Sequence, residues 1–265
     1  MQGIRPFKRE QGSGEPVVCL HSNASSSSQW RALAELLADR FHVIAVDGYG
    51  AGKSPEWPGP APLRLEDEVR LLEGILDRAG ERFHLVGHSY GGAVAMKAAV
   101  MHPQRVRSVV IYEPTLFHLV AGGDPANSSI QGIWRAASDA ADAVDQGDRH
   151  GGARRFIDFW MGSGAFDAMP PARQAGIETS VRSVRAWRDT LVDETMPLPA
   201  LAALDVPVLC MWGEASPESS LSVVRVLRET LKNVTPAPQP GLGHMGPITH
   251  PDAINAQIAR FLRQH

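Results

Sequence analysis

One serine in this sequence stands in a setting that suits nucleophilic chemistry. The segment Gly87-His88-Ser89-Tyr90-Gly91 follows an apolar strand pattern that begins at Phe83 and precedes a helical pattern that begins at Ala93. A serine at the tip of such a sharp turn is exposed for reaction, and glycines two positions before and after it let strand and helix pass closely. The helix directs its N-terminus at the turn, where the backbone N–H of Tyr90 is placed to stabilise an oxyanion. The pattern therefore predicts Ser89 as a nucleophile.

With this turn, the sequence resembles the α/β-hydrolase superfamily over nearly its whole length. Besides the Ser89 turn, the resemblance depends on three segments, Leu20-His21-Ser22-Asn23, Asp47-Gly48-Tyr49-Gly50-Ala51-Gly52-Lys53-Ser54 and Gly241-Leu242-Gly243-His244-Met245-Gly246-Pro247. It implies an α/β-hydrolase fold, that is, a mostly parallel, doubly wound sheet with an inserted helical cap. It also implies a base in the loop before the last helix, and His244 stands there. We therefore expect His244 to accept the proton of Ser89.

The acid is the residue for which the sequence departs from the usual pattern of the superfamily. Most members place it shortly after the strand expected here at Val206 to Trp212, but Ala215 and Ser216 stand where an aspartate would be expected. Haloalkane dehalogenases of this superfamily carry a glutamate at the end of the preceding core strand, and the stretch Ser108 to Pro114 resembles theirs. The resemblance implies Glu113 as the acid that orients His244, with Glu214 as the alternative.

The nucleophile itself narrows the chemistry. Dehalogenases and epoxide hydrolases of this superfamily use an aspartate, which forms an alkyl ester that water can cleave. A serine in that place would form an alkyl ether, so Ser89 indicates acyl chemistry instead. We expect a carboxylesterase-like serine hydrolase that cleaves a small-molecule carboxylic ester or related acyl compound through an acyl-enzyme. Two alternatives use the same residues, C–C bond hydrolysis next to a ketone and acyl transfer. A third is a non-catalytic ligand receptor on the same fold.

Further residues are expected around the reacting carbonyl group. The backbone N–H groups of Asn23 and Tyr90 are predicted to form the oxyanion hole, and His21 and Ser22 are predicted to line the substrate site beside them. Three tryptophans of the helical segment, Trp134, Trp160 and Trp187, are candidates for an apolar pocket wall.

Strand and helix patterns alternate along the first half of the chain and then stop. Short apolar runs at Pro16 to His21, Val43 to Val46, Phe83 to Val86 and Val106 to Tyr112 predict parallel strands that alternate with helices. From about residue 115 to 199 we find only helical patterns, around Ile133 to Val144, Ala153 to Trp160 and Arg173 to Leu191. Strand character returns at Val206 to Trp212 and at Val234 to Gln239, where two prolines fit only an edge strand. The chain is therefore divided into a core of residues 1–114 and 200–265 and a helical cap of residues 115–199.

Composition excludes several other classes of protein. The chain of 265 residues has a formal net charge of −3 and no basic block, so no nucleic-acid or anionic membrane partner is expected. No apolar run is long enough to span a bilayer and no signal peptide is evident, which favours a cytoplasmic location. The two cysteines, Cys19 and Cys210, lie in apolar runs and are predicted to be buried, reduced thiols. No metal-ligand spacing is found, no cofactor is expected, and the sequence leaves the oligomeric state open, a homodimer included.

Overall fold

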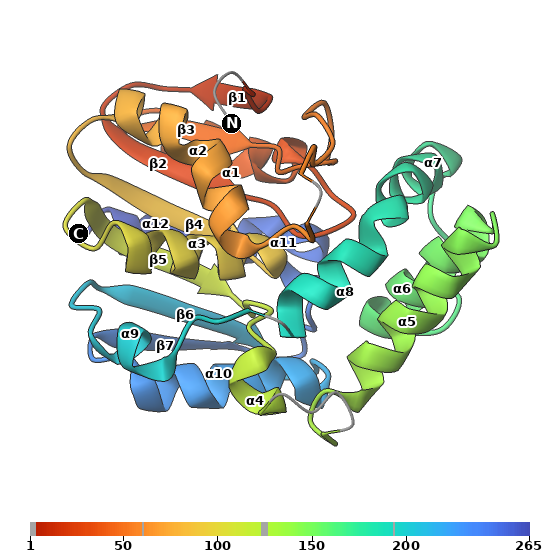
Figure 1. Cartoon of the computed structure of the whole chain (residues 1–265). Coiled ribbons are helices and arrows are strands. Elements are labelled where there is room, and N and C mark those ends of the chain that lie inside the picture. Colours follow the sequence, from red (N-terminus) through yellow and green to blue (C-terminus); the bar gives the residue numbers. More distant parts are fainter. Residues whose placement is uncertain (1–3, 60, 123–126, 193) are drawn as a thin grey trace.

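A single sheet organises the molecule (Figure 1). The computed structural model describes residues 4–59, 61–122, 127–192 and 194–265, and its sheet has seven strands in the order β1-β3-β2-β4-β5-β6-β7. Strand β1 runs antiparallel to β3, and every other pair is parallel. The strands are β1 (Lys8–Gln11), β2 (Glu15–Leu20), β3 (Phe41–Val46), β4 (Phe83–His88), β5 (Val106–Tyr112), β6 (Val208–Gly213) and β7 (Val234–Gln239). The predicted mostly parallel α/β sheet is thus confirmed.

The two edges of the sheet differ in how well their sequences predict them. The sequence of β1, Lys8-Arg9-Glu10-Gln11, has no apolar residue, and its pattern does not predict a strand. It pairs only with β3 at one edge, where hydrogen bonds of the backbone suffice and no side chain has to enter the core. At the other edge, β7 pairs only with β6 and contains Pro236 and Pro238. The predicted edge position of this strand is confirmed.

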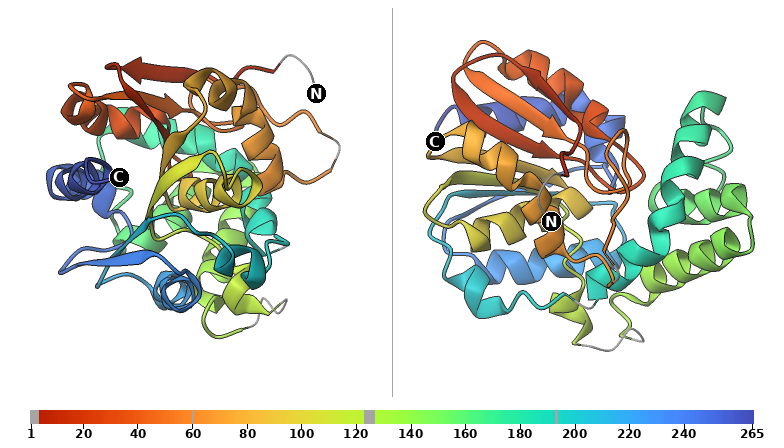
Figure 2. Two further views of the ribbon diagram at one scale, coloured as in Figure 1. Left: turned by 90° about the vertical axis from the view of Figure 1, so that its left-hand side faces the viewer. Right: turned by 45° about the horizontal axis from the view of Figure 1, so that its top comes forward.

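Helices cover both faces of the sheet. Helices α1 (Arg31–Leu37) and α12 (Pro251–Leu262) pack on one face, while α2 (Leu65–Ala79), α3 (Tyr90–Met101) and α10 (Glu218–Thr230) lie on the other (Figure 2). In α2 the apolar side chains Leu65, Val69, Leu72 and Leu76 recur at helical spacing and are all buried. Helix α3 is buried along most of its length because it lies at the centre, behind the turn at Ser89.

The segment between β5 and β6 is helical, and we call it the helical insertion. It comprises α4 (His118–Ala121), α5 (Gln131–Asp145), α6 (Arg149–Met161), α7 (Pro171–Ser180), the 3₁₀ turn η2 (Val181–Ser183), α8 (Val184–Val192) and α9 (Leu198–Ala202). Its helices α5 to α8 form a layer beyond one end of the sheet, while α9 lies beside α10 (Figures 1 and 2). Its described residues include no strand, as predicted. The short helices α4 and α9 were not predicted, and the expected single helix from Arg173 to Leu191 is interrupted by η2. The boundaries at residues 115 and 199 stay predictions.

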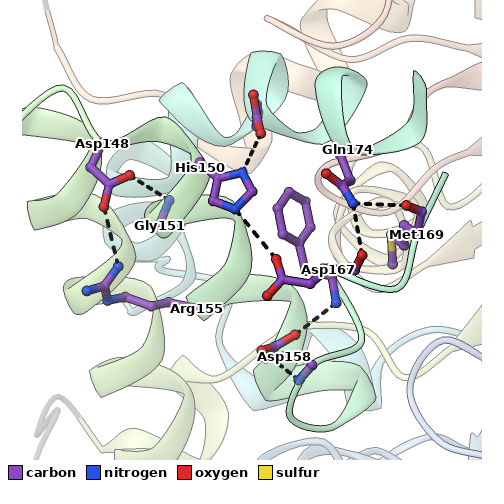
Figure 3. Close-up of polar contacts among 11 residues, drawn as sticks. Asp148, His150, Gly151, Arg155, Asp158, Asp167, Met169 and Gln174 are labelled. Atoms are coloured by element: carbon purple, nitrogen blue, oxygen red, sulfur yellow. Dashed lines mark hydrogen bonds and ion pairs between the residues drawn. The ribbon is translucent and has the colours of Figure 1, made fainter. Parts of the chain in front are cut away.

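Polar contacts fix the turns of the insertion (Figure 3). The Asp148 carboxylate caps α6 by accepting a hydrogen bond from the Gly151 N–H. After α6, Asp158 accepts from the N–H groups of Gly164 and Phe166 and thereby closes the following turn. The side-chain amide of Gln174 in α7 donates to the carbonyl groups of Asp167 and Met169. These bonds set the angle between α6 and α7.

Two predictions that concern the whole chain are tested by the same structure. Cys19 and Cys210 are free and buried, which confirms the predicted core thiols. In the parts of the chain that the structure describes, no helix has the length and apolar character needed to cross a membrane.

Candidate active site

Ser89 occupies the tip of the turn between β4 and α3, in a strained backbone conformation. Its φ of 55° and ψ of −118° lie in a region that residues with a side chain rarely adopt. The two glycines of the turn make this possible, because a Cβ on Gly87 would come within 2.3 Å of the Gly91 carbonyl oxygen. A Cβ on Gly91 would come equally close, 2.3 Å, to the carbonyl oxygen of Leu20. The turn therefore requires glycine at both positions, as its sequence pattern predicts.

His244 meets Ser89 from the loop that follows β7, the strand at one edge of the sheet. Its Nε2 lies 2.9 Å from the Ser89 Oγ, and both residues are buried. The loop that carries His244 lies between β7 and α11 (Gly246–Thr249). Tyr112, the last residue of β5, holds this loop in place, because its hydroxyl donates to the Gly243 carbonyl oxygen at 2.9 Å. This arrangement lets His244 Nε2 accept the serine proton.

Glu113 is the acid that contacts this histidine. One of its carboxylate oxygens, Oε2, lies 2.7 Å from His244 Nδ1. Glu113 directly follows β5, with a φ of 43°, and its N–H donates to the Met211 carbonyl oxygen of the neighbouring strand. Only three non-glycine residues of the described chain have positive φ, namely Ala24, Ser89 and Glu113. All three lie at this site, which is where backbone strain concentrates in functional proteins.

The other carboxylate oxygen of Glu113 contacts the segment in which most members of the superfamily carry their acid. Oε1 accepts a hydrogen bond from the Ser216 hydroxyl at 2.6 Å and one from the Gly213 N–H at 2.7 Å. Ser216 thus stands where an aspartate is usual, and it supplies a proton donor to the carboxylate that arrives from β5. Glu214, the alternative acid, is exposed, and the hydrogen bonds of the His244 ring within the described chain go to other residues. The structure brings Glu113, and not Glu214, to the histidine.

A second histidine connects the two loops that flank Ser89. His88 Nε2 donates to the backbone carbonyl oxygen of His244 at 2.8 Å, and His88 Nδ1 accepts from the Gln29 side-chain amide at 3.1 Å. The Gln29 Oε1 in turn accepts from both the N–H and the hydroxyl of Ser22. Burial, followed by the charge of His244, lowers the pKa of His88 well below its ordinary value, so the ring stays neutral. The chain of bonds runs from the loop after β2 to the loop of the base.

The residues after β2 show how the predicted oxyanion site is built. Within the described part of the chain, the backbone N–H groups of Asn23 and Tyr90 make no hydrogen bond to protein, so both are available to a ligand. The polar atoms of the other two predicted residues are already engaged. The His21 Nδ1–H donates to the Ser22 carbonyl oxygen, and the His21 Nε2 accepts from the Gly48 N–H. The Ser22 hydroxyl is bonded to Gln29.

A small apolar cavity lies beside Ser89. All three tryptophans expected at the pocket wall line it, together with Phe117, Ile130, Ile133, Ala137, Phe156, Val184, Arg188, Asn23 and Thr115. The centres of water-sized molecules can occupy about 30 Å³ of this cavity, so it accepts only a small group unless its walls move. A much larger cleft of about 740 Å³ lies between insertion and core and includes Asn23 and Met245. Asn23 lines both the cavity and the cleft.

Trp160 has a contact that the sequence did not predict. Its indole ring stacks on the imidazole of His244, with ring centroids 3.8 Å apart and planes inclined by 23°. The face of an aromatic ring attracts a cation, so this contact favours the imidazolium that forms when His244 holds a proton. In the described residues, no group of three or more His, Cys, Asp or Glu side chains is placed to hold a metal ion.

The sequence did not predict the site contacts of four residues. Gln29 and Ser216 look like ordinary loop residues, and the only signal for Ser216 is its position where the usual acid is absent. His88 lies within the predicted turn, but the turn pattern assigns no hydrogen-bonding role to it. The stacking of Trp160 on His244 depends on how the insertion docks, which no local pattern reveals.

Comparisons with known proteins show the family to which the chain belongs. A model of the Alpha/beta hydrolase family matches residues 17–257, and the chain belongs to that family. A haloalkane dehalogenase of Agrobacterium fabrum is 35% identical over 117 residues, 43% of this chain and 37% of that protein. A 2-hydroxymuconate semialdehyde hydrolase of a Pseudomonas species is 35% identical over 113 residues, 41% of this chain and 40% of that protein. The chain thus spans about two fifths of the length of these relatives.

Solved structures match over the whole chain. The crystal structure of a carboxylesterase from Bacillus subtilis covers 100% of this chain and 90% of its own, with a TM-score of 0.75 and 21% sequence identity. At that identity the match concerns the fold. The relatives include hydrolases of several kinds, and all share the fold of the Alpha/beta hydrolase family.

Proposed function

We propose that this protein is a serine hydrolase that cleaves small carboxylic esters or related acyl compounds through an acyl-enzyme. The observation that carries the proposal is the continuous contact from Ser89 Oγ to His244 Nε2, at 2.9 Å, and from His244 Nδ1 to Glu113 Oε2, at 2.7 Å. This is the arrangement that lets a serine attack a carbonyl carbon while its proton passes to a fixed histidine.

The proposed reaction has two halves. Ser89 Oγ bonds to the carbonyl carbon and its proton moves to His244 Nε2, while the N–H groups of Asn23 and Tyr90 hold the oxyanion. The tetrahedral intermediate expels the leaving group, which takes the proton from His244 and departs as an alcohol. A water molecule then gives a proton to His244, attacks the acyl carbon and releases the carboxylic acid with the serine restored. Glu113 keeps the proton of His244 on Nδ1 and stabilises the imidazolium.

The surroundings of Ser89 support a small acyl group. The apolar cavity beside it suits a short hydrocarbon chain, and the aromatic ring of Trp160 stabilises the protonated histidine. The serine in place of an aspartate argues against dehalogenation, although a haloalkane dehalogenase is among the relatives. C–C bond hydrolysis with the same three residues is a second candidate, favoured by the similarity to the 2-hydroxymuconate semialdehyde hydrolase.

A fluorophosphonate probe tests the proposal directly. We expect mass spectrometry to find one adduct on Ser89 in the wild type and none in Ser89→Ala. Two kinds of substrate then separate the two candidate reactions. Nitrophenyl esters of acetate, butanoate and hexanoate test ester hydrolysis, and a diketone tests C–C bond hydrolysis. If the folded wild type forms no adduct, the chain is not a serine enzyme and a ligand receptor replaces the proposal. Turnover of the diketone without turnover of any ester selects C–C bond hydrolysis.

A further inference from the structure

A second cavity lies on the other side of the oxyanion site from the apolar cavity at Ser89. Its floor is apolar and comes from the carboxyl ends of β2 and β3 and from α2 and α3, through Leu20, Val46, Leu72 and Val94. Trp187 of the insertion covers it. Asn23 and Trp187 line both cavities, so the two spaces meet at the oxyanion site.

One charged side chain is buried in this second cavity. Glu68 of α2 is only 4% exposed, although acidic residues are seldom buried without a partner of opposite charge. Its Oε2 accepts from the Tyr49 N–H at 3.2 Å, and its Oε1 accepts from the Tyr90 hydroxyl at 3.3 Å. No Lys, Arg or His side chain of the described chain forms an ion pair with it. Each carboxyl oxygen has two lone pairs, so each retains the capacity for another hydrogen bond.

The histidine ring at the wall of the cavity, His21, is already engaged. Both ring nitrogens of His21 are engaged, with Ser22 and Gly48. Burial raises the pKa of Glu68 to about 7, so its carboxyl group is poised between its two protonation states near neutral pH. A buried acid without a cation, facing an apolar cavity beside a nucleophile, is the combination that marks a ligand subsite.

We propose that Glu68 forms a second subsite, which binds a hydroxyl group carried on the acyl part of the substrate. This inference rests on the proposed function. The centres of water-sized molecules can occupy only about 30 Å³ of the cavity, which fits a hydroxyl group and not a ring. A hydroxyl on the carbon next to an ester carbonyl lies close to the carbonyl oxygen. When that oxygen meets the N–H groups of Asn23 and Tyr90, the hydroxyl is directed towards the second cavity.

The subsite also assigns a double role to the residue after the nucleophile. The Tyr90 backbone N–H faces the oxyanion, while its side chain ends on Glu68. A hydroxyl bound to Glu68 would therefore align the carbonyl group on the same residue that stabilises its negative charge. The substrates predicted by this geometry are esters of short 2-hydroxy or 3-hydroxy acids.

The test compares phenyl butanoate with phenyl 2-hydroxybutanoate and phenyl 3-hydroxybutanoate. In the wild type we expect at least one hydroxy ester to have a kcat/KM about 10- to 100-fold above that of the plain ester, the range of one hydrogen bond to a charged group. Glu68→Leu should abolish this preference, so that the kcat/KM of the preferred hydroxy ester falls about 10- to 100-fold more than that of the plain ester. Glu66→Gln, which changes an exposed acid of the same helix, should leave the preference intact.

The outcomes separate this inference from the proposed function. Equal loss for plain and hydroxylated esters in Glu68→Leu overturns the subsite, because Glu68 would then only support Tyr90 and the loop at Tyr49. A wild type that hydrolyses all three esters without preference also overturns it, while the proposed function stands. If the wild type hydrolyses none of the three, both proposals fall. Glu68→Gln keeps the size of the side chain and should retain part of the preference, which guards against a folding defect in the leucine variant.

Discussion

Replacing Glu113 by glutamine should abolish the proposed hydrolase activity through the tautomer of His244. The Oε1 of Glu113 faces two donors, the Gly213 N–H at 2.7 Å and the Ser216 hydroxyl at 2.6 Å. A backbone N–H can only donate, so the carbonyl oxygen of the introduced glutamine must take this place. Its NH₂ group then occupies the position of Oε2 and faces His244 Nδ1, 2.7 Å away in the wild type.

The consequence for His244 follows from proton counting. Nδ1 must accept a hydrogen bond from the new NH₂ group, so the ring proton moves to Nε2. That nitrogen then has no lone pair for the proton of Ser89. In serine hydrolases the wrong tautomer costs on the order of 10⁴ in kcat, which corresponds to about 5.5 kcal/mol of activation free energy. Because glutamine has the size of glutamate and keeps both bonds at Oε1, we expect little change in Tm.

The assay is the hydrolysis of a nitrophenyl ester, with thermal unfolding measured on the same samples. Glu214→Gln is the matched control, since Glu214 is an exposed acid in the loop after the neighbouring strand β6. It should retain nearly full activity. The reasoning is refuted if Glu113→Gln keeps more than a tenth of the wild-type kcat/KM while folded. It is equally refuted if the two variants lose activity to the same extent.

Three further predictions concern the groups around this core. Ser216→Ala removes a charge-assisted hydrogen bond from a buried carboxylate and should lower the free energy of unfolding by about 1.5–3 kcal/mol in urea titrations; an unchanged midpoint would contradict that bond. Trp160→Leu should lower the kcat for ester hydrolysis about 10-fold, and Trp160→Phe should restore most of it, because the aromatic face stabilises the imidazolium; equal rates for the two variants would exclude that contribution. Burial raises the pKa of Glu68 to about 7 in the folded protein, above its value in the unfolded chain. As the pH rises from the unfolded to the folded pKa, the unfolded chain loses this proton first, so the contribution of Glu68 to the stability of the wild type falls. We therefore expect the free energy of unfolding of Glu68→Gln, relative to that of the wild type, to be higher at pH 8 than at pH 4.5 by on the order of 3 kcal/mol. Denaturation at the two pH values measures this, and a difference independent of pH would refute it.

The sequence predicts those parts of the site that depend on local pattern and chain order. Ser89 lies in a turn whose glycines are required by close backbone approach, and His244 occupies a loop that the family uses for its base. Glu113 ends a strand next to that of the nucleophile, so parallel pairing brings the two to the same edge of the sheet.

Contacts between distant segments could not be predicted in the same way. The bond between Gln29 and His88 joins residues 59 positions apart, and no periodicity links them. The stacking of Trp160 on His244 depends on the angle at which the insertion docks. Trp134 and Trp187 are also tryptophans in helices of the insertion, so the local sequence does not indicate which of the three contacts His244. In the sequence, Glu68 is one of three consecutive acidic residues in the first turn of α2. Only its position three residues after Leu65 and four before Leu72, on the apolar face, signals that it is buried.

The hydrogen bond between Ser216 and Glu113 has a consequence for how such enzymes diverge. The loop after β6 and the end of β5 approach the same histidine, one with a hydroxyl and the other with a carboxylate, 2.6 Å apart. Exchanging the two groups, Glu113→Ser with Ser216→Asp, would move the negative charge from one strand end to its neighbour without changing the kinds of group present. Descendants of one ancestor can thus differ in the position of the acid along the chain while they keep one geometry around the base. Position in an alignment is then a poor guide to the acid, and the distance to the histidine is the better one.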